Sequence, residues 1–90
     1  MKHLNITLKG KVQGVFFRVS AREKARQLGL NGFCRNEADG SLYLEAEGDD
    51  EALAEFIKWC RVGPPAARVD KLEKEEVELK DYDEFQIKYR

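Results

Sequence analysis

The pattern of apolar residues changes from strand-like to helix-like within residues 10–18, and this change constrains the fold more than any other feature. Before it, apolar residues alternate with polar ones at Leu4, Ile6 and Leu8, which is typical of a strand with one buried face. After it, apolar residues recur at helical spacing at Phe17, Ala21, Ala25 and Leu28. The sequence therefore predicts a strand that leads through a tight turn into an amphipathic helix, which Gly29 ends.

The turn has the composition of an anion-binding site. Gly10 and Gly14 adopt backbone conformations that other residues resist, and they let a ligand approach the main chain. The first N–H groups of a helix have no intrahelical acceptor, and the helix dipole adds partial positive charge beside them. Arg18 stands at the helix start, where its guanidinium can form two parallel hydrogen bonds with a phosphoryl group. We therefore expect residues 10–18 to bind phosphate; the alternatives are a merely tight connection and a solvated Arg18.

A hairpin and a second helix follow. Residues 33–37 and 42–47 flank Asp39-Gly40, a strong hairpin signal. Asp49 or Asp50 can cap the helix. Its apolar stripe consists of Leu53, Phe56, Ile57 and Cys60, and Gly63-Pro64-Pro65 closes it.

Two C-terminal strands complete the pattern. Residues 69–77 are crowded with charge, which favours an edge strand with a bulge. A terminal strand is indicated by the alternating Phe85, Ile87 and Tyr89. The order is β-α-β-β-α-β with one further short strand, which predicts an α+β fold: a ferredoxin-like split βαβ sandwich with an antiparallel sheet and two helices packed on one face. We expect residues 1–90 to form a single domain, because a chain of this length can bury one core.

Asn36 is the second candidate for the site. In a split βαβ unit, the strand that leaves the first helix ends at the same sheet edge as the first strand. The side-chain amide of Asn36, at that end, offers a donor and an acceptor, which can hold a water in line with a bound phosphorus. The alternative is an Asx-type hydrogen bond at the hairpin entrance. One intervening strand would separate the two strand ends by about 10 Å.

Charge and composition exclude several functions. The chain has 16 basic and 17 acidic residues, so the whole molecule lacks the electrostatic footprint of a protein that coats nucleic acid or an anionic membrane. Basic residues prevail in residues 1–45 and acidic ones in 46–90, which places the expected anion site in the basic half. No apolar run is long enough for a membrane span or a signal peptide, and we predict a cytoplasmic protein. A nucleotide-binding P-loop is excluded, because no Gly-Lys-Ser/Thr follows the first glycine.

Other reactive residues have structural interpretations. Cys34 and Cys60 lack the spacing of a metal or redox pair, and we interpret both as reduced structural thiols, with Cys34 in the core. His3 has no acid, nucleophile or metal partner at an evident spacing, which favours a surface histidine. The acidic residues at 49–51 suit a helix N-terminus without any metal.

At the two candidate segments the chain resembles the acylphosphatase family. Residues 10–18 match that family's first motif, Gly-x-Val-Gln-Gly-Val-x-Phe-Arg, at every fixed position. The segment Gly32-Phe33-Cys34-Arg35-Asn36, followed by Gly40 and Gly48, matches its second. Cys34 stands where valine is commoner, and Leu42 where valine is usual. The resemblance covers essentially the whole chain.

The resemblance implies hydrolysis of the carboxyl–phosphate bond of small acyl phosphates, which yields a carboxylate and inorganic phosphate without metal or cofactor. At the matching positions Arg18 binds the phosphoryl group and Asn36 orients the attacking water. Amides in the stretch Gln13, Gly14, Val15, Phe16 and Phe17 hold the phosphate oxygens. Because an acyl phosphate already has a good leaving group, positioning and charge stabilisation can carry the reaction.

Two other functions stay open at this point. The first is a non-catalytic ferredoxin-like module that binds a phosphorylated ligand or RNA, since this fold hosts many functions. RNA recognition, however, favours exposed aromatics and a basic sheet face, whereas this chain has Glu45 and Glu47 on its third strand. The second is an acylphosphatase-like domain of a larger modification enzyme.

The charged strand at 69–77 discourages pairing between copies, so we expect a monomer.

Overall fold

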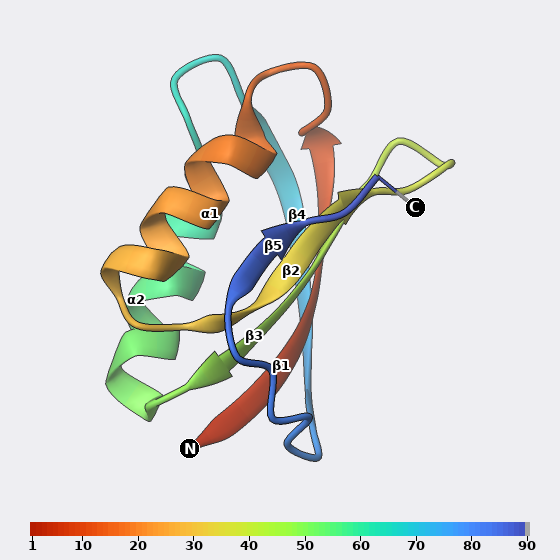
Figure 1. The fold of residues 1–90 in the computed structure, drawn as a ribbon. Helices are drawn as coiled ribbons and strands as arrows, with labels where there is room; N and C mark the ends of the chain where they lie inside the picture. Colours follow the sequence, from red (N-terminus) through yellow and green to blue (C-terminus); the bar gives the residue numbers. More distant parts are fainter. Residues whose placement is uncertain (90) are drawn as a thin grey trace.

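The computed structural model describes residues 1–89, which form a five-stranded sheet covered on one face by two helices (Figure 1). In chain order the elements are β1 (Lys2–Lys11), α1 (Phe17–Gln27), β2 (Asn31–Asn36), β3 (Leu42–Gly48), α2 (Asp50–Cys60), β4 (Arg68–Val77) and β5 (Phe85–Ile87). This is the predicted order, and the ferredoxin-like fold class is confirmed. Within residues 1–89, no helix is long and apolar enough to cross a membrane.

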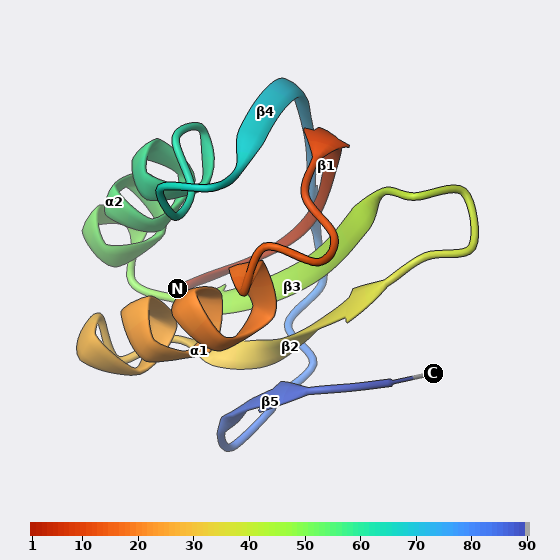
Figure 2. The same cartoon turned by 90° about the horizontal axis from the view of Figure 1, so that it is seen from above.

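The strands are arranged in the order β4-β1-β3-β2-β5 (Figure 2). β1 pairs antiparallel with β3 and β4, and β3 pairs antiparallel with β2. β5, however, pairs parallel with β2, so the sheet is mixed and the prediction of an antiparallel sheet is wrong for this pair. The last residues of β4 lie at the same end of the sheet as the first residues of β2. The chain then crosses to the opposite edge of the sheet, where β5 runs parallel to β2. β3 lies between β1 and β2, as the predicted separation of their ends requires.

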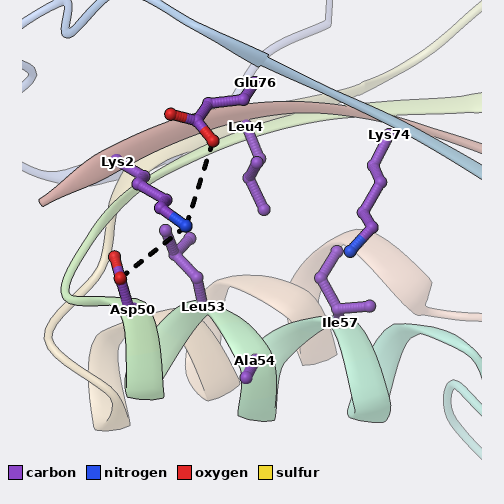
Figure 3. Close-up of a pocket in the computed structure, with 8 residues that line it drawn as sticks. All are labelled: Lys2, Leu4, Asp50, Leu53, Ala54, Ile57, Lys74 and Glu76. Carbon is purple, nitrogen blue, oxygen red and sulfur yellow. Dashed lines mark ion pairs between the residues drawn. The ribbon is translucent and has the colours of Figure 1, made fainter.

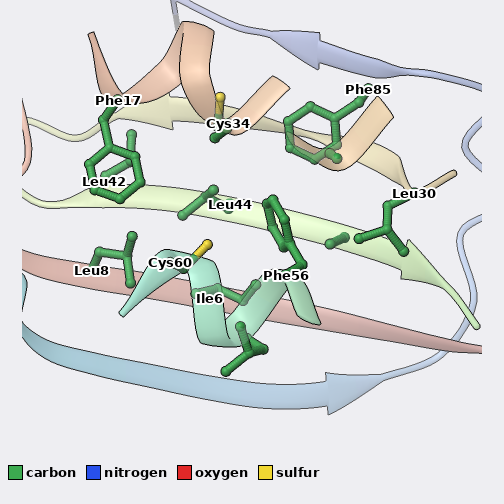
Figure 4. Packing of buried hydrophobic residues seen from close by; sticks show 14 of the residues in the cluster. Ile6, Leu8, Phe17, Leu30, Cys34, Leu42, Leu44, Phe56, Cys60 and Phe85 are labelled. Carbon is green, nitrogen blue, oxygen red and sulfur yellow. The ribbon is translucent and has the colours of Figure 1, made fainter. Parts of the chain in front are cut away.

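The core lies between the helices and the sheet (Figure 4). The predicted helical stripes face the core, with Phe17, Ala21 and Ala25 buried on α1, and Leu53, Phe56, Ile57 and Cys60 buried on α2. Leu28, predicted as the last residue of the first stripe, follows the end of α1 and is only partly buried. The predicted sheet-face residues of β1 and β3 meet them from the other side. Phe56 joins the layers, because its ring packs edge-on against Phe85 of β5 with centroids 5.9 Å apart. Of the predicted terminal strand only Phe85 is buried, and Tyr89 lies beyond β5, largely exposed.

His3 is buried, and the prediction of a surface histidine is wrong. Its Nδ1 lies 3.0 Å from Glu47 Oε1 and its Nε2 lies 2.7 Å from Glu45 Oε1. The alternation of β1 places His3 on the face away from the helices, and the segment between β4 and β5 crosses that face. The main-chain N–H of Lys80 donates to Glu47 Oε1, and the ring of Tyr82 packs against His3. The histidine thus joins distant parts of the chain, a contact that its local sequence does not indicate.

β4 is an edge strand with an irregular pairing, as its charge predicts. Its register with β1 shifts between Lys9 and Gly10. Gly10 has φ 132°, and a Cβ there would collide with the main-chain carbonyl of Arg68. Gly10 therefore serves the close approach of β1 and β4, whereas Gly14 has φ 72° and open space at its Cβ position.

The start of α2 differs from the prediction in one detail. Asp49 stands at the N-cap position, but its side chain makes no capping hydrogen bond. Asp50 and Glu51 instead place negative charge in the first turn, where the helix dipole favours it.

Candidate active site

The loop between β1 and α1 has strained backbone where it enters the helix. Phe16, immediately before α1, adopts the left-handed conformation with φ 62° and ψ 23°, and its side chain is 82% exposed. Such a conformation is costly for a bulky residue, and residues strained in this way cluster at functional sites. No side chain caps this end of α1, and its first turn holds no acidic residue. The first N–H groups of α1 are therefore free of a side-chain anion, and an anionic ligand can take that place.

A cavity of about 250 Å³ opens beside this loop. It is lined by Val12, Gly14, Phe16, Phe17, Arg18, Val19, Asn36, Ile87 and Tyr89. Both residues predicted as catalytic, Arg18 and Asn36, are among them, although they come from different elements. Of the residues predicted to hold phosphate oxygens, Gly14, Phe16 and Phe17 line the cavity as well.

Arg18 is half-buried at the start of α1. The Cζ atom of its guanidinium lies 4.9 Å from the centroid of the Tyr89 ring. Within residues 1–89, no carboxylate lies within ion-pair distance of this guanidinium. The guanidinium is held against an aromatic ring and lines the cavity. It can therefore bind a phosphoryl group without first breaking an ion pair in this part of the chain.

Asn36 is the last residue of β2, and its side chain lines the same cavity. Its Oδ1 atom is buried and has no hydrogen-bond partner among the residues that the structure describes. Buried side-chain oxygens without a partner are rare in folded proteins. The unpaired oxygen is suited to accept a hydrogen bond from a water molecule in the cavity.

Gln13 connects the loop to the β2–β3 hairpin. Its Nε2 donates to the main-chain carbonyls of Glu37 at 2.8 Å and Ser41 at 2.9 Å. These bonds hold the loop at the hairpin between the end of β2 and the start of β3, next to Asn36, and so bridge the gap that the intervening strand creates. Neither Gln13 nor the buried Val15 lines the cavity. Sequence reasoning missed this role of the Gln13 side chain, because its two partners are distant in the sequence and are main-chain atoms.

Cys34 supports the site from the core. The thiol is fully buried on β2, and burial raises its pKa to about 12, although Arg18 and Arg22 act in the opposite direction. Its Sγ donates a weak hydrogen bond to the carbonyl of Arg18 at 3.7 Å. Cys60 is also buried, and burial raises its pKa too. The prediction of structural core thiols is confirmed by their burial.

A larger hollow of about 440 Å³ lies between α2 and strands β1 and β4 (Figure 3). Three of its four charged side chains are paired with one another, since the Lys2 ammonium lies 3.7 Å from Asp50 and 3.9 Å from Glu76. The fourth is Lys74. None of the predicted phosphate-site residues lines it. The cavity beside α1 is therefore the better candidate for an active site, because it combines a guanidinium, a glycine-containing helix entrance and an amide oxygen that is unpaired in the described part of the chain.

Fold and site together define an α+β sandwich with a cavity lined by a guanidinium and a buried amide at a strand-to-helix turn. The sequence model of the acylphosphatase family matches residues 4–87, and the chain belongs to this family.

Individual relatives agree over nearly the whole chain. An acylphosphatase of Methylococcus capsulatus is 44% identical, over 97% of this chain and 96% of the relative. An acylphosphatase of Thermotoga maritima is 45% identical over 99% of both chains. The crystal structure of acylphosphatase from Bacillus subtilis superposes with a TM-score of 0.96 at 32% identity, and the match covers 99% of this chain and 100% of that one. The expected family is thus confirmed.

Proposed function

We propose that this protein hydrolyses the carboxyl–phosphate bond of acyl phosphates by direct attack of a water molecule on phosphorus. One observation carries the proposal: Arg18 and Asn36, whose amide oxygen has no hydrogen-bond partner within residues 1–89, line a single cavity at the entrance of α1. Family membership supports the reaction class.

The phosphoryl group binds at the loop. Main-chain N–H groups from Gly14 to Phe17 donate to its oxygens, and Arg18 adds a two-pronged, charge-assisted interaction. Gly14 and Phe16 both have positive φ, 72° and 62°. Left-handed residues in a turn allow successive N–H groups to converge on an anion. Charge that builds on the phosphoryl oxygens during transfer is stabilised by groups that are already in position.

Asn36 orients the nucleophile. Its Oδ1 accepts a hydrogen bond from the water and holds the water oxygen toward phosphorus. The new O–P bond forms as the P–O bond to the acyl group breaks, and the carboxylate leaves with the electron pair of the broken bond. One proton of the water stays on the oxygen that is now bonded to phosphorus, and the other passes to a phosphate oxygen or to solvent. A carboxylate is a good leaving group, so the reaction needs no acid to protonate it and no covalent enzyme intermediate.

Neither a metal nor a cofactor takes part in the proposed reaction. The experiment is to measure phosphate release from acetyl phosphate and benzoyl phosphate in the presence of a chelator, with inorganic phosphate as a competitive inhibitor. In water labelled with heavy oxygen, the label should enter the phosphate and not the carboxylate. Dependence on added metal, or label in the carboxylate, would contradict this mechanism.

We further propose that the protein acts in the cytoplasm as a monomer on small molecules. The charged β4 edge and the two buried thiols support this proposal. Sedimentation analysis tests the monomer. Filter binding to RNA at modest salt tests the competing function, a phosphate-binding module without catalysis; retention of RNA together with absent phosphate release would favour that module.

A further inference from the structure

Large apolar side chains gather at the mouth of the candidate active site. Within residues 1–89, six such side chains are exposed: Met1, Phe16, Val19, Val62, Leu79 and Tyr89. Three of these six, Phe16, Val19 and Tyr89, line the one cavity that also contains Arg18. Exposed apolar groups that cluster beside a binding site commonly serve a ligand.

The cavity has a polar part and an apolar part. Gly14, Arg18 and Asn36 form the polar part. Ile87, partly buried against the core, joins the three exposed residues in the apolar part. Among residues 1–89, Arg18 is the one charged residue that lines the cavity. A ligand that matches both parts carries an anionic group at one end and an uncharged apolar group at the other.

An acyl phosphate with an apolar acyl group has this shape. Its acyl carbon is separated from phosphorus by a single oxygen, so a phosphoryl group in the loop carries the acyl chain into the mouth of the same cavity. The Tyr89 ring stands with its centroid 4.9 Å from the Arg18 guanidinium, which places an apolar surface directly beside the group that binds phosphate.

We propose that Phe16, Val19, Ile87 and Tyr89 form an acyl subsite that selects acyl phosphates with uncharged apolar acyl groups. This inference rests on the proposed function and adds the substrate class to it. The subsite binds the acyl group similarly in the ground state and the transition state, so it lowers KM more than it raises kcat.

The test compares acetyl, butanoyl and hexanoyl phosphates with succinyl monophosphate, whose acyl group carries a negative charge. The three straight-chain acids have nearly equal acidity, so the leaving-group chemistry stays constant while apolar area grows. We expect kcat/KM to rise about 10-fold from acetyl to hexanoyl phosphate, because an open mouth buries the added methylenes only in part. Succinyl phosphate should be hydrolysed no faster than butanoyl phosphate.

Two variants assign the effect to the subsite. Tyr89→Ser and Val19→Thr should each reduce the hexanoyl-to-acetyl ratio of kcat/KM to about 3 or less, since each removes apolar surface. Tyr89→Phe should retain the ratio. Val62→Thr is the matched control for Val19→Thr, because Val62 is an exposed valine outside the cavity, and it should leave the ratio unchanged.

The outcomes separate this inference from the proposed function. A flat series with normal acetyl phosphate hydrolysis, a preference for succinyl phosphate, or an unchanged ratio in both folded variants would overturn the acyl subsite and leave the hydrolase intact. Absence of phosphate release from all four compounds would overturn the hydrolase and the subsite with it.

Discussion

The side-chain amide of Gln13 donates a 2.8 Å hydrogen bond to the main-chain carbonyl of Glu37, the residue that follows Asn36. This bond joins the loop between β1 and α1 to the end of the strand that carries the predicted water-binding amide. A second bond from the same nitrogen reaches Ser41 on the other side of the hairpin. Besides the pairing of β1 and β2 with β3, one side chain outside the cavity thus links the two halves of the site directly.

Gln13→Ala should therefore impair catalysis through position. We expect kcat to fall about 10- to 100-fold, because small misplacements of reacting groups are costly, and the free energy of unfolding to fall by about 1 to 3 kcal/mol. Steady-state kinetics and urea unfolding measure the two effects. Gln86→Ala on the exposed face of β5 is the control, and equal kcat values for Gln13→Ala and wild type would contradict the positioning role.

Arg18→Ala should abolish both phosphate binding and turnover. We expect kcat/KM to fall about 1,000-fold or more, since the guanidinium supplies most of the fixed positive charge of the site. Arg18→Lys should also be severely impaired, because an ammonium cannot form the planar pair of hydrogen bonds. Phosphate inhibition constants and phosphate-release rates give the measurement, with the exposed Arg61→Ala as control. Normal turnover in Arg18→Ala would exclude the proposed role.

Asn36→Ala should separate binding from turnover. We expect kcat to fall about 100-fold while the inhibition constant of phosphate changes less than about 3-fold, since the amide acts on water and not on the phosphoryl group. Asn31→Ala, at the opposite end of β2, is the matched control. A large loss of phosphate affinity with unchanged kcat would assign Asn36 to the phosphate instead.

Gly10→Ala and Gly14→Ala should differ in what they damage. The Cβ at residue 10 collides with the Arg68 carbonyl in a left-handed region of backbone, so we expect a loss of about 2 to 4 kcal/mol in stability. The Cβ at residue 14 meets open space, and only its conformation costs about 1 kcal/mol. Thermal unfolding and phosphate inhibition should show Gly10→Ala as the less stable variant and Gly14→Ala as the poorer phosphate binder. The reverse ranking would contradict the division of roles.

Acid should weaken the fold through Glu47. Burial raises the pKa of this carboxyl, but hydrogen bonds from the Lys80 main chain and His3 outweigh it and lower the pKa below its ordinary value of 4.5. A lowered pKa in the folded state means that this stabilisation is complete above pH 4.5 and is lost as the pH falls through the folded-state value. The neighbouring Glu45 and Tyr82 face the same histidine.

Glu47→Gln tests this dependence. At pH 7 we expect it to reduce the free energy of unfolding by about 1 to 3 kcal/mol, and the difference from wild type should shrink at pH values below 4.5. Urea unfolding across this pH range measures both. The exposed Glu55→Gln should have little effect, and a difference that stays constant down to pH 3 would argue against the ionised carboxylate as the cause.

Much of the fold was accessible from sequence because it depends on local patterns. The start of α1 at Phe17, the two buried helical stripes and the hairpin at Asp39-Gly40 follow from side-chain periodicity and turn chemistry, which act between near neighbours. The edge position of β4 was also predictable, because it follows from the charged side chains of the strand itself. The two candidate residues, Arg18 and Asn36, were found from residue type at a strand or helix end together with the family motifs, and their catalytic roles stay predictions.

The sequence by itself determined the elements, the family and the residues to examine. Only the tertiary structure decided the parallel pairing of β5, the burial of His3 between two glutamates, the tether through Gln13 and the apolar mouth that includes Tyr89. Each of these depends on groups that are distant in the chain, and several involve main-chain atoms, which every residue possesses alike. Local periodicity carries no information on such partners, because it records which face of an element is apolar and not what that face meets.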